Sequence, residues 1–219
     1  MSIKLARQDI TQDNAEVKQF RNSKTKIKLK ETYKYEKGLL MIFGQPLTYK
    51  IIVAGQGAVG KTTMLKRYQS GKFIPAITTI GVNFIVKEYD FQGKTLTLSI
   101  WDYAGEARFR ALFPSYCSGS TGALVVFDLT RPQTMEELEP WIDIVREQNG
   151  DIPCILIGSK KDLVDEEEIN FQLNEGKDYV NEIGLAGVYL CSSKTGEGID
   201  DVFEFLALQI TNYIAKKKR

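Results

Sequence analysis

The sequence contains no histidine among its 219 residues. Without an imidazole there is no Ser-His-Asp triad, no histidine general base and no histidine ligand for a metal ion. Cysteine is scarce as well, because Cys117, Cys154 and Cys191 are widely spaced and form no C-x-x-C pair. We therefore expect neither a disulfide framework nor a zinc site, and a reducing, cytoplasmic setting.

Long apolar runs are also missing. The apolar stretch Leu39-Leu40-Met41-Ile42-Phe43 has only five residues, whereas a helix that spans a bilayer needs about 20. The N-terminus shows no secretory signal pattern, and Ser2 stands where myristoylation requires glycine. The last cysteine is Cys191, so we expect no prenylation.

Charge is nearly balanced over the whole chain, with a net value of +1, but it is unevenly distributed. Residues 1–38 carry ten Lys or Arg against five Asp or Glu, and Lys216-Lys217-Lys218-Arg219 adds four positive charges, which leaves residues 39–215 at −8. The basic ends either bind an acidic partner or anionic lipid, or are solvated extensions. At about 1 kcal/mol per basic residue, membrane contact through them would be weak and peripheral at most. We expect no nucleic-acid partner.

What the sequence does contain is a glycine-rich stretch, Gly55-Gln56-Gly57-Ala58-Val59-Gly60-Lys61-Thr62, that fits G-x-x-x-x-G-K-[ST] at every fixed position. A β-rich run precedes it and a helix-forming segment follows it, which is the order that a phosphate-binding loop requires. The glycines let backbone amides close on a polyphosphate, Lys61 adds a positive charge, and Thr62 offers a hydroxyl to Mg²⁺. The alternative is a chance glycine-rich turn.

From Leu47 onward, apolar β-rich runs alternate with helical patterns, which predicts an α/β fold. We expect strands at 47–54, 82–91, 94–101, 122–128, 153–158 and 187–191, and helices at 61–70, 134–148, 168–182 and 198–214. A turn at Gln92-Gly93 predicts a hairpin, and hence one antiparallel edge strand in a mostly parallel six-stranded sheet with helices on both faces. The domains expected are a basic N-terminal extension (1–46), one α/β domain (47–214) and a basic C-terminal tail (215–219).

The strand that ends at Trp101-Asp102 has a carboxylate as its last side chain, as expected of a Walker-B aspartate that holds Mg²⁺. The run from Trp101 to Arg110 (WDYAGEARFR) is similar to the W-D-T-A-G-Q-E-R-F-R segment of the Rab branch of Ras-superfamily small GTPases. The resemblance extends over about residues 47–214. It implies a P-loop NTPase fold of the small G-domain type that acts as a GTP/GDP-dependent molecular switch with Mg²⁺. It also implies effectors, an exchange factor and a GTPase-activating protein.

The same resemblance implies residue roles. Thr79 matches the threonine of the first switch, Ser159-Lys160-Lys161-Asp162 resembles the N-K-x-D guanine box, and Cys191-Ser192-Ser193-Lys194 resembles the T-S-A-K loop. The implied nucleotide-binding set is Gly55, Gly57, Ala58, Val59, Gly60, Lys61, Thr62, Thr63, Thr79, Gly105, Ser159, Lys160, Asp162, Ser192, Ser193 and Lys194. The implied metal ligands are Thr62, Thr79 and Asp102, and the implied catalytic set is Glu106, Lys61, Thr79 and Gly105.

Two of these assignments have purely structural alternatives. Asp162 would accept from the two N–H donors on the Watson–Crick edge of guanine, or it could merely cap a helix. Phe84, Trp101 and Tyr116 match the aromatic triad through which Rab proteins contact effectors, or they are plain core aromatics.

The departures from the family pattern bear on the chemistry. Glu106 stands where the family has the glutamine that orients the attacking water, and a carboxylate only accepts hydrogen bonds and carries charge. We therefore expect slow GTP hydrolysis. Ser159 stands where the family has asparagine, and its hydroxyl is too short to hold both the phosphate loop and the base, which predicts faster nucleotide release. A non-hydrolysing GTP-binding scaffold and, third, a P-loop ATPase or kinase remain as alternatives. Tyr103 in place of threonine has no explanation from the sequence.

Overall fold

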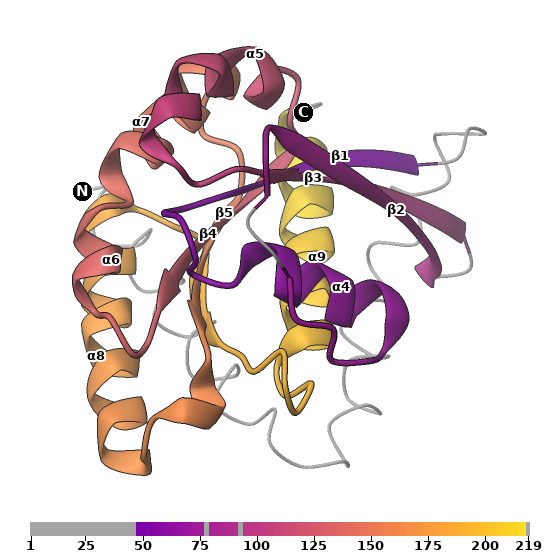
Figure 1. Ribbon diagram of the computed structural model, residues 1–219. Helices are drawn as coiled ribbons and strands as arrows, with labels where there is room; N and C mark the ends of the chain where they lie inside the picture. The colour runs from indigo at the N-terminus through magenta and orange to yellow at the C-terminus, as the bar shows by residue number, and fades with distance from the viewer. Residues whose placement is uncertain (1–46, 77–78, 92–93, 218–219) are drawn as a thin grey trace, which may run out of the picture. The chain divides into compact units, whose positions relative to one another are not determined.

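Six strands form the central sheet of the part of the chain that the computed structural model describes, residues 47–76, 79–91 and 94–217. The spatial order is β2-β3-β1-β4-β5-β6 (Figure 1). β2 pairs antiparallel with β3, and the remaining pairs are parallel. The predicted α/β fold with one antiparallel edge strand is confirmed. The strands are β1 (Leu47–Ala54), β2 (Val82–Phe91), β3 (Lys94–Tyr103), β4 (Gly122–Asp128), β5 (Cys154–Ser159) and β6 (Gly187–Leu190).

Both faces of the sheet are buried, which explains why its central strands are continuous apolar runs. Successive side chains of a strand point to opposite faces, so Ile51 and Val53 of β1 pack in one core cluster while Ile52 and Ala54 pack in the other. All seven residues of β4 are buried. A sheet of this kind needs helices on both sides to exclude water.

The helices supply this cover from both sides (Figure 1). α4 (Lys61–Ser70) and α9 (Ile199–Lys217) pack on one face, where Tyr68 stacks on Phe203 with ring centres 3.7 Å apart. α5 (Phe113–Cys117), α7 (Glu139–Asn149) and α8 (Glu166–Ile183) contribute to the cluster on the other face. In the described part of the chain, no helix combines the length and the apolar character that crossing a bilayer demands.

One predicted helix is wrong, and another helical segment was missed. The helix expected at 134–148 is two helices, α6 (Gln133–Glu136) and α7, because Pro140 in the first turn of α7 favours a new start over continuation. The segment after β3 forms the 3-10 helix η2 (Ala107–Leu112) followed by α5. Neither has the length that makes an apolar period visible in the sequence.

Other boundaries differ by a few residues. β3 continues to Tyr103, and β5 spans 154–159 instead of 153–158. Asp165 accepts a hydrogen bond from the backbone N–H of Glu168 at 2.9 Å, so α8 begins at Glu166 and not at 168. α9 continues to Lys217, into the residues expected to form the tail. The N-terminal extension expected at 1–46 and the turn at Gln92-Gly93 lie outside the described residues.

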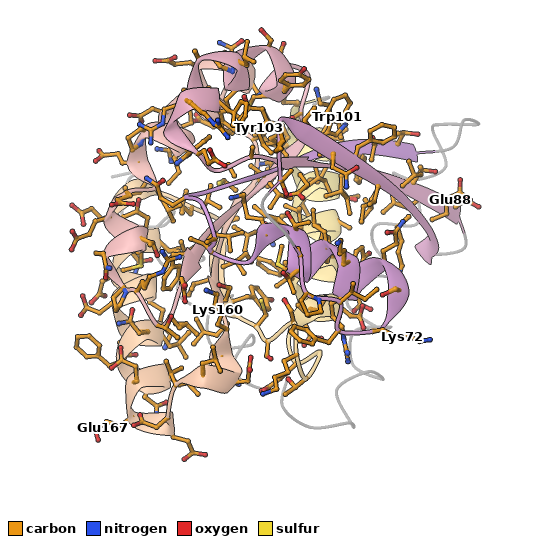
Figure 2. All side chains as sticks on the ribbon, viewed as in Figure 1. Lys72, Glu88, Trp101, Tyr103, Lys160 and Glu167 are labelled. Carbon is orange, nitrogen blue, oxygen red and sulfur yellow. The ribbon has the colours of Figure 1, made fainter. Side chains whose placement is uncertain are left out.

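The structure explains the tyrosine at position 103. Its ring is buried against Phe113 and Trp141, with ring centres 4.9 and 6.3 Å away, and its hydroxyl donates to the backbone carbonyl of Phe109 in η2. Tyr103 and Trp101 are labelled in Figure 2, and both rings contact the ring of Tyr116, with centres 5.7 and 6.3 Å away. Tyr103 therefore ties the segment after β3 to the hydrophobic core, which a threonine at this position could not do.

We expect Tyr103→Phe to lower the free energy of unfolding by about 1 kcal/mol, because the partly buried Phe109 carbonyl loses its hydroxyl donor. Tyr179→Phe is the matched control, since the buried Tyr179 hydroxyl has no hydrogen-bond partner among the described residues. Urea denaturation of the three proteins checks this. Equal losses in both variants would show that the contact to Phe109 carries no stability of its own.

Candidate functional site

The glycine-rich loop lies at the carboxyl end of β1 and leads into α4. Gly55 has a φ of 134°, and a Cβ on it would lie 2.3 Å from the carbonyl oxygen of Val126 in the neighbouring strand β4. Only glycine fits here, for backbone conformation and for space alike. The loop then turns directly into the N-terminus of α4 at Lys61, where free helix amides favour an anion.

Lys61 is buried within its own loop. Its exposed fraction is 6%, and its ammonium donates to the carbonyls of Gly55 and Gln56 at 2.8 and 2.7 Å. Burial lowers the pKa of Lys61 to about 8, although the nearby carboxylate of Asp102 acts in the opposite direction. A polyanion beside this ammonium would favour its charged form, so the site suits a phosphate ligand.

Two side chains from the end of β5 hold the same loop. Ser159 is buried, and its hydroxyl lies 2.5 Å from the carbonyl oxygen of Val59 and 2.9 Å from that of Phe127. Lys160, labelled in Figure 2, donates to the carbonyl of Ala58 at 3.1 Å. A hydroxyl has one proton to donate, so the single donor of Ser159 is already used by the backbone.

Three oxygen-bearing side chains meet at the start of α4. The Thr62 hydroxyl donates to Oδ2 of Asp102 at 2.6 Å, and Thr79 Oγ1 lies 2.6 Å from Thr62 Oγ1. The other carboxylate oxygen of Asp102, Oδ1, is buried without a hydrogen-bond partner. Burial raises the pKa of Asp102, against the effect of the Thr62 hydrogen bond and the Lys61 charge. A hard cation beside an orphaned carboxylate oxygen would relieve this cost.

This oxygen set fits Mg²⁺, which prefers oxygen ligands. Within the described residues, no three carboxylate or cysteine side chains gather into a metal cluster. Thr62, Thr79 and Asp102 would hold the ion, and the oxygens of a bound phosphate group would suit the rest of its shell.

Asp162 lies beside the loop that follows β6. It belongs to the 3-10 helix η3 (Lys161–Leu163), accepts a hydrogen bond from the Ser192 hydroxyl at 2.5 Å, and has Lys194 Nζ at 3.9 Å. The cap of α8 is Asp165, so Asp162 does not have the capping role that was the alternative. Its partners lie 30 and 32 positions further along the chain and hold it as an acceptor at the carboxyl edge of the sheet.

Gly105 and Glu106 follow β3. A Cβ on Gly105 would lie 2.3 Å from the backbone of Gln56, so this glycine packs directly on the phosphate loop. The carboxylate of Glu106 pairs with Arg108, with Oε2 2.7 Å from Nε. Both partners are partly exposed, and such pairs contribute about 0–1 kcal/mol. The residue that stands in place of the glutamine is thus paired with a neighbour two residues on.

The three aromatic residues expected at an effector surface do lie together. Ring centres of Phe84 and Trp101 are 5.8 Å apart, and those of Trp101 and Tyr116 are 6.3 Å apart. Phe84 is 61% exposed, so it is not a core residue. Val86, two residues on in β2, is also exposed.

The structure offers less support for two of the predicted nucleotide-binding residues. Thr63, in the first turn of α4, and Ser193 are half-buried, and neither side chain has a hydrogen bond to another described residue. Sequence reasoning also missed Asp128, which is fully buried at the end of β4 and carries an ion pair to Lys160 at 2.6 Å. The available signal was its position, because a carboxylate ends an apolar strand there just as Asp102 ends β3.

A parallel sheet with a phosphate loop after β1, a magnesium-type oxygen set and a carboxylate acceptor beyond β5 defines a P-loop nucleotide-binding protein. Residues 50–212 match the model of the Ras family. The chain is 35% identical over 162 residues to Ras-related protein Rab-21 of Bos taurus, covering 73% of this chain and 72% of that protein. Ras-related protein Rab-21 of Homo sapiens gives the same identity over 73% and 71%. The chain therefore belongs to the Ras family of small GTPases, in its Rab-like branch.

Members of this family bind guanine nucleotide with Mg²⁺, hydrolyse GTP and act as switches. They work with effectors, exchange factors and GTPase-activating proteins.

Proposed function

We propose that this protein is a GTP/GDP-dependent switch that binds nucleotide through the loop 55–62 and Asp162, and that hydrolyses GTP slowly. The observation that carries the switch is the 2.6 Å contact between the hydroxyls of Thr79 and Thr62. It joins the segment before β2 directly to the start of α4. Loss of a γ-phosphate, and the change at Mg²⁺ that goes with it, would therefore directly alter the contacts that position the first switch.

Guanine selectivity is proposed to rest on Asp162. As a carboxylate it accepts hydrogen bonds but cannot donate them, which suits the two N–H donors on the Watson–Crick edge of guanine and not the edge of adenine. The Ser192 hydroxyl supports this role by holding Oδ1 at 2.5 Å. Lys61, Lys160 and the amides of the loop 55–60 are proposed to bind the phosphates, and Thr62, Thr79 and Asp102 to hold Mg²⁺.

Slow hydrolysis is proposed because Glu106 cannot donate to a γ-phosphoryl oxygen while it accepts from water, as a glutamine amide can. Its ion pair with Arg108, in which Oε2 lies 2.7 Å from Nε, offsets part of the carboxylate charge, so we propose that hydrolysis is slowed and not abolished. The alternative, a non-hydrolysing scaffold, is also suggested by Glu106. The intact set of Lys61, Thr62 and Asp102 favours the enzyme, because a scaffold has no need of a metal-binding oxygen set.

One experiment separates these readings. The nucleotide that co-purifies with the full chain is identified, and γ-phosphate release is then followed in single turnovers with GTP and with ATP. Bound guanine nucleotide with slow, GTP-specific release supports the switch. Bound GTP that persists without any release supports the scaffold, and release from ATP at a similar rate would overturn the guanine assignment.

We expect Ser159→Asn to slow nucleotide release about fivefold. One added hydrogen bond of about 1 kcal/mol to the base corresponds to that factor, and the Ser159 hydroxyl has no donor left for a base while it serves Val59. Stopped-flow release of a fluorescent GDP in excess Mg²⁺ measures it. Equal off-rates for the two proteins would count against the proposal that serine weakens nucleotide retention.

Partners are proposed to dock on the surface formed by Phe84, Trp101 and Tyr116, because Phe84 exposes most of its ring there. The protein is proposed to act in the cytoplasm, with no nucleic-acid partner. Any membrane contact would be weak, peripheral and carried by the basic ends.

A further inference from the structure

Every backbone carbonyl from Gly55 to Val59 in the phosphate loop accepts a hydrogen bond from a side chain. Lys61 donates to the first two, the carbonyls of Gly55 and Gln56. The next three have separate donors, in chain order Arg131 to Gly57 at 3.4 Å, Lys160 to Ala58 at 3.1 Å, and Ser159 to Val59 at 2.5 Å. Arg131 belongs to no motif that the sequence displayed.

These contacts set the direction of the loop amides. A peptide unit is planar, and in the trans form its C=O and N–H point in opposite directions; no cis peptide bond occurs in the described residues. A side chain that holds the carbonyl of Gly57 therefore also aims the N–H of Ala58 away from itself. The donors on Gly57, Ala58 and Val59 together orient three successive amides, those of residues 58, 59 and 60.

Asp128 anchors two of the three donors. Its carboxylate is fully buried, and Oδ2 lies 2.9 Å from Arg131 Nε and 2.6 Å from Lys160 Nζ. Thr130 donates twice to Oδ1, at 3.0 and 2.7 Å. Burial alone would raise the pKa of Asp128, but these hydrogen bonds outweigh it and lower the pKa. The anchor is thus a fixed charge.

The chemistry of arginine suits the position of Arg131 between Asp128 and Gly57. The guanidinium is planar and presents several N–H donors in a rigid fork, so Nε can pair with the carboxylate while Nη2 reaches the loop carbonyl. A lysine ammonium is a single point charge and cannot hold both groups in one fixed geometry.

We propose that Arg131 is a positioning residue that helps to retain the nucleotide. It holds the Gly57 carbonyl and thereby points the amide N–H of Ala58 toward the phosphates. The inference rests on the proposed function of the loop 55–62 as the phosphate site. The contact comes from the segment after β4, since Arg131 lies beyond the end of that strand at Asp128, and it adds to the donor that Ser159 supplies to Val59. Arg131 touches the loop and not the reacting atoms, so its effect falls on nucleotide release.

The test uses the full chain loaded with fluorescent GDP in excess Mg²⁺ and chased with unlabelled GDP. Arg131→Ala is expected to release GDP about three- to tenfold faster than wild type, the range for loss of one long, half-exposed charged hydrogen bond. Arg131→Lys keeps the charge and most of the length, and we expect it to recover at most half of the effect. Arg146→Ala is the matched control, because Arg146 also donates to a backbone carbonyl, that of Ile183, but away from the loop.

A second readout needs no nucleotide. Hydrogen exchange of the amides of residues 58–60 in the nucleotide-free protein is expected to quicken in Arg131→Ala and to stay unchanged in Arg146→Ala. Wild-type release and wild-type exchange in both Arg131 variants would overturn the inference and leave the proposed function intact. Failure of the wild-type protein to bind any guanine nucleotide would instead overturn the proposed function, and unchanged exchange at 58–60 would still refute the role of Arg131.

Discussion

Glu106→Gln is expected to hydrolyse GTP at least tenfold faster than the wild-type protein. A carboxylate about 4 Å from a phosphoryl oxygen, at an effective dielectric constant of about 20, is repelled by roughly 4 kcal/mol, or close to three orders of magnitude in rate. The ion pair with Arg108 and the charge of Mg²⁺ offset part of this repulsion. The amide also restores a group that can accept from water and donate to phosphate together.

The pairing with Arg108 offers a control that isolates the charge. In the wild-type background Arg108→Ala removes the partner of Glu106, and we expect hydrolysis to slow further. In the Glu106→Gln background the same substitution is expected to have a smaller effect, because no carboxylate is left to neutralise. Single-turnover γ-phosphate release measures all four proteins. A Glu106→Gln protein no faster than wild type would refute the proposed cause of slow turnover.

The second large effect is expected at Asp162. Asp162→Asn replaces one accepting oxygen by an N–H donor, which then faces a donor on the guanine edge. Sites built to pair a polar group reject a ligand that lacks it by roughly 10⁴ to 10⁵. We therefore expect the preference for GTP over ATP to fall by at least about a hundredfold, mainly through weaker binding of GTP.

Competition binding of GTP and ATP to the two proteins measures this preference. Asp165→Asn is the matched control, since Asp165 lies three residues away and only caps α8, a role that asparagine fills equally well. An unchanged preference in Asp162→Asn would show that the base is selected elsewhere.

Local pattern alone predicted several strands of this protein. β1 and β4 have the predicted bounds because apolar runs of their length, ended by Gly or Asp, leave few other solutions. β2 also has the predicted bounds, although Phe84 and Val86 are exposed. The segment 107–117 was missed because two short helices do not develop a period. The break before α7 was missed because Pro140 lies inside an otherwise helical pattern, where it starts a helix instead of ending one.

The sequence by itself determined the phosphate loop, the order of the strands along the chain and the identity of the family. A loop motif acts through neighbouring residues of one segment, so spacing along the chain is enough to find it. Only the tertiary structure decided which distant residues meet. Arg131 reaches Gly57 across 74 positions and Ser159 reaches Val59 across 100, because parallel strands joined by helices bring their carboxyl ends to one edge. The conformation after β3 likewise decided that Glu106 pairs with Arg108 and that Tyr103 holds η2, since both contacts depend on how that segment folds back on the sheet.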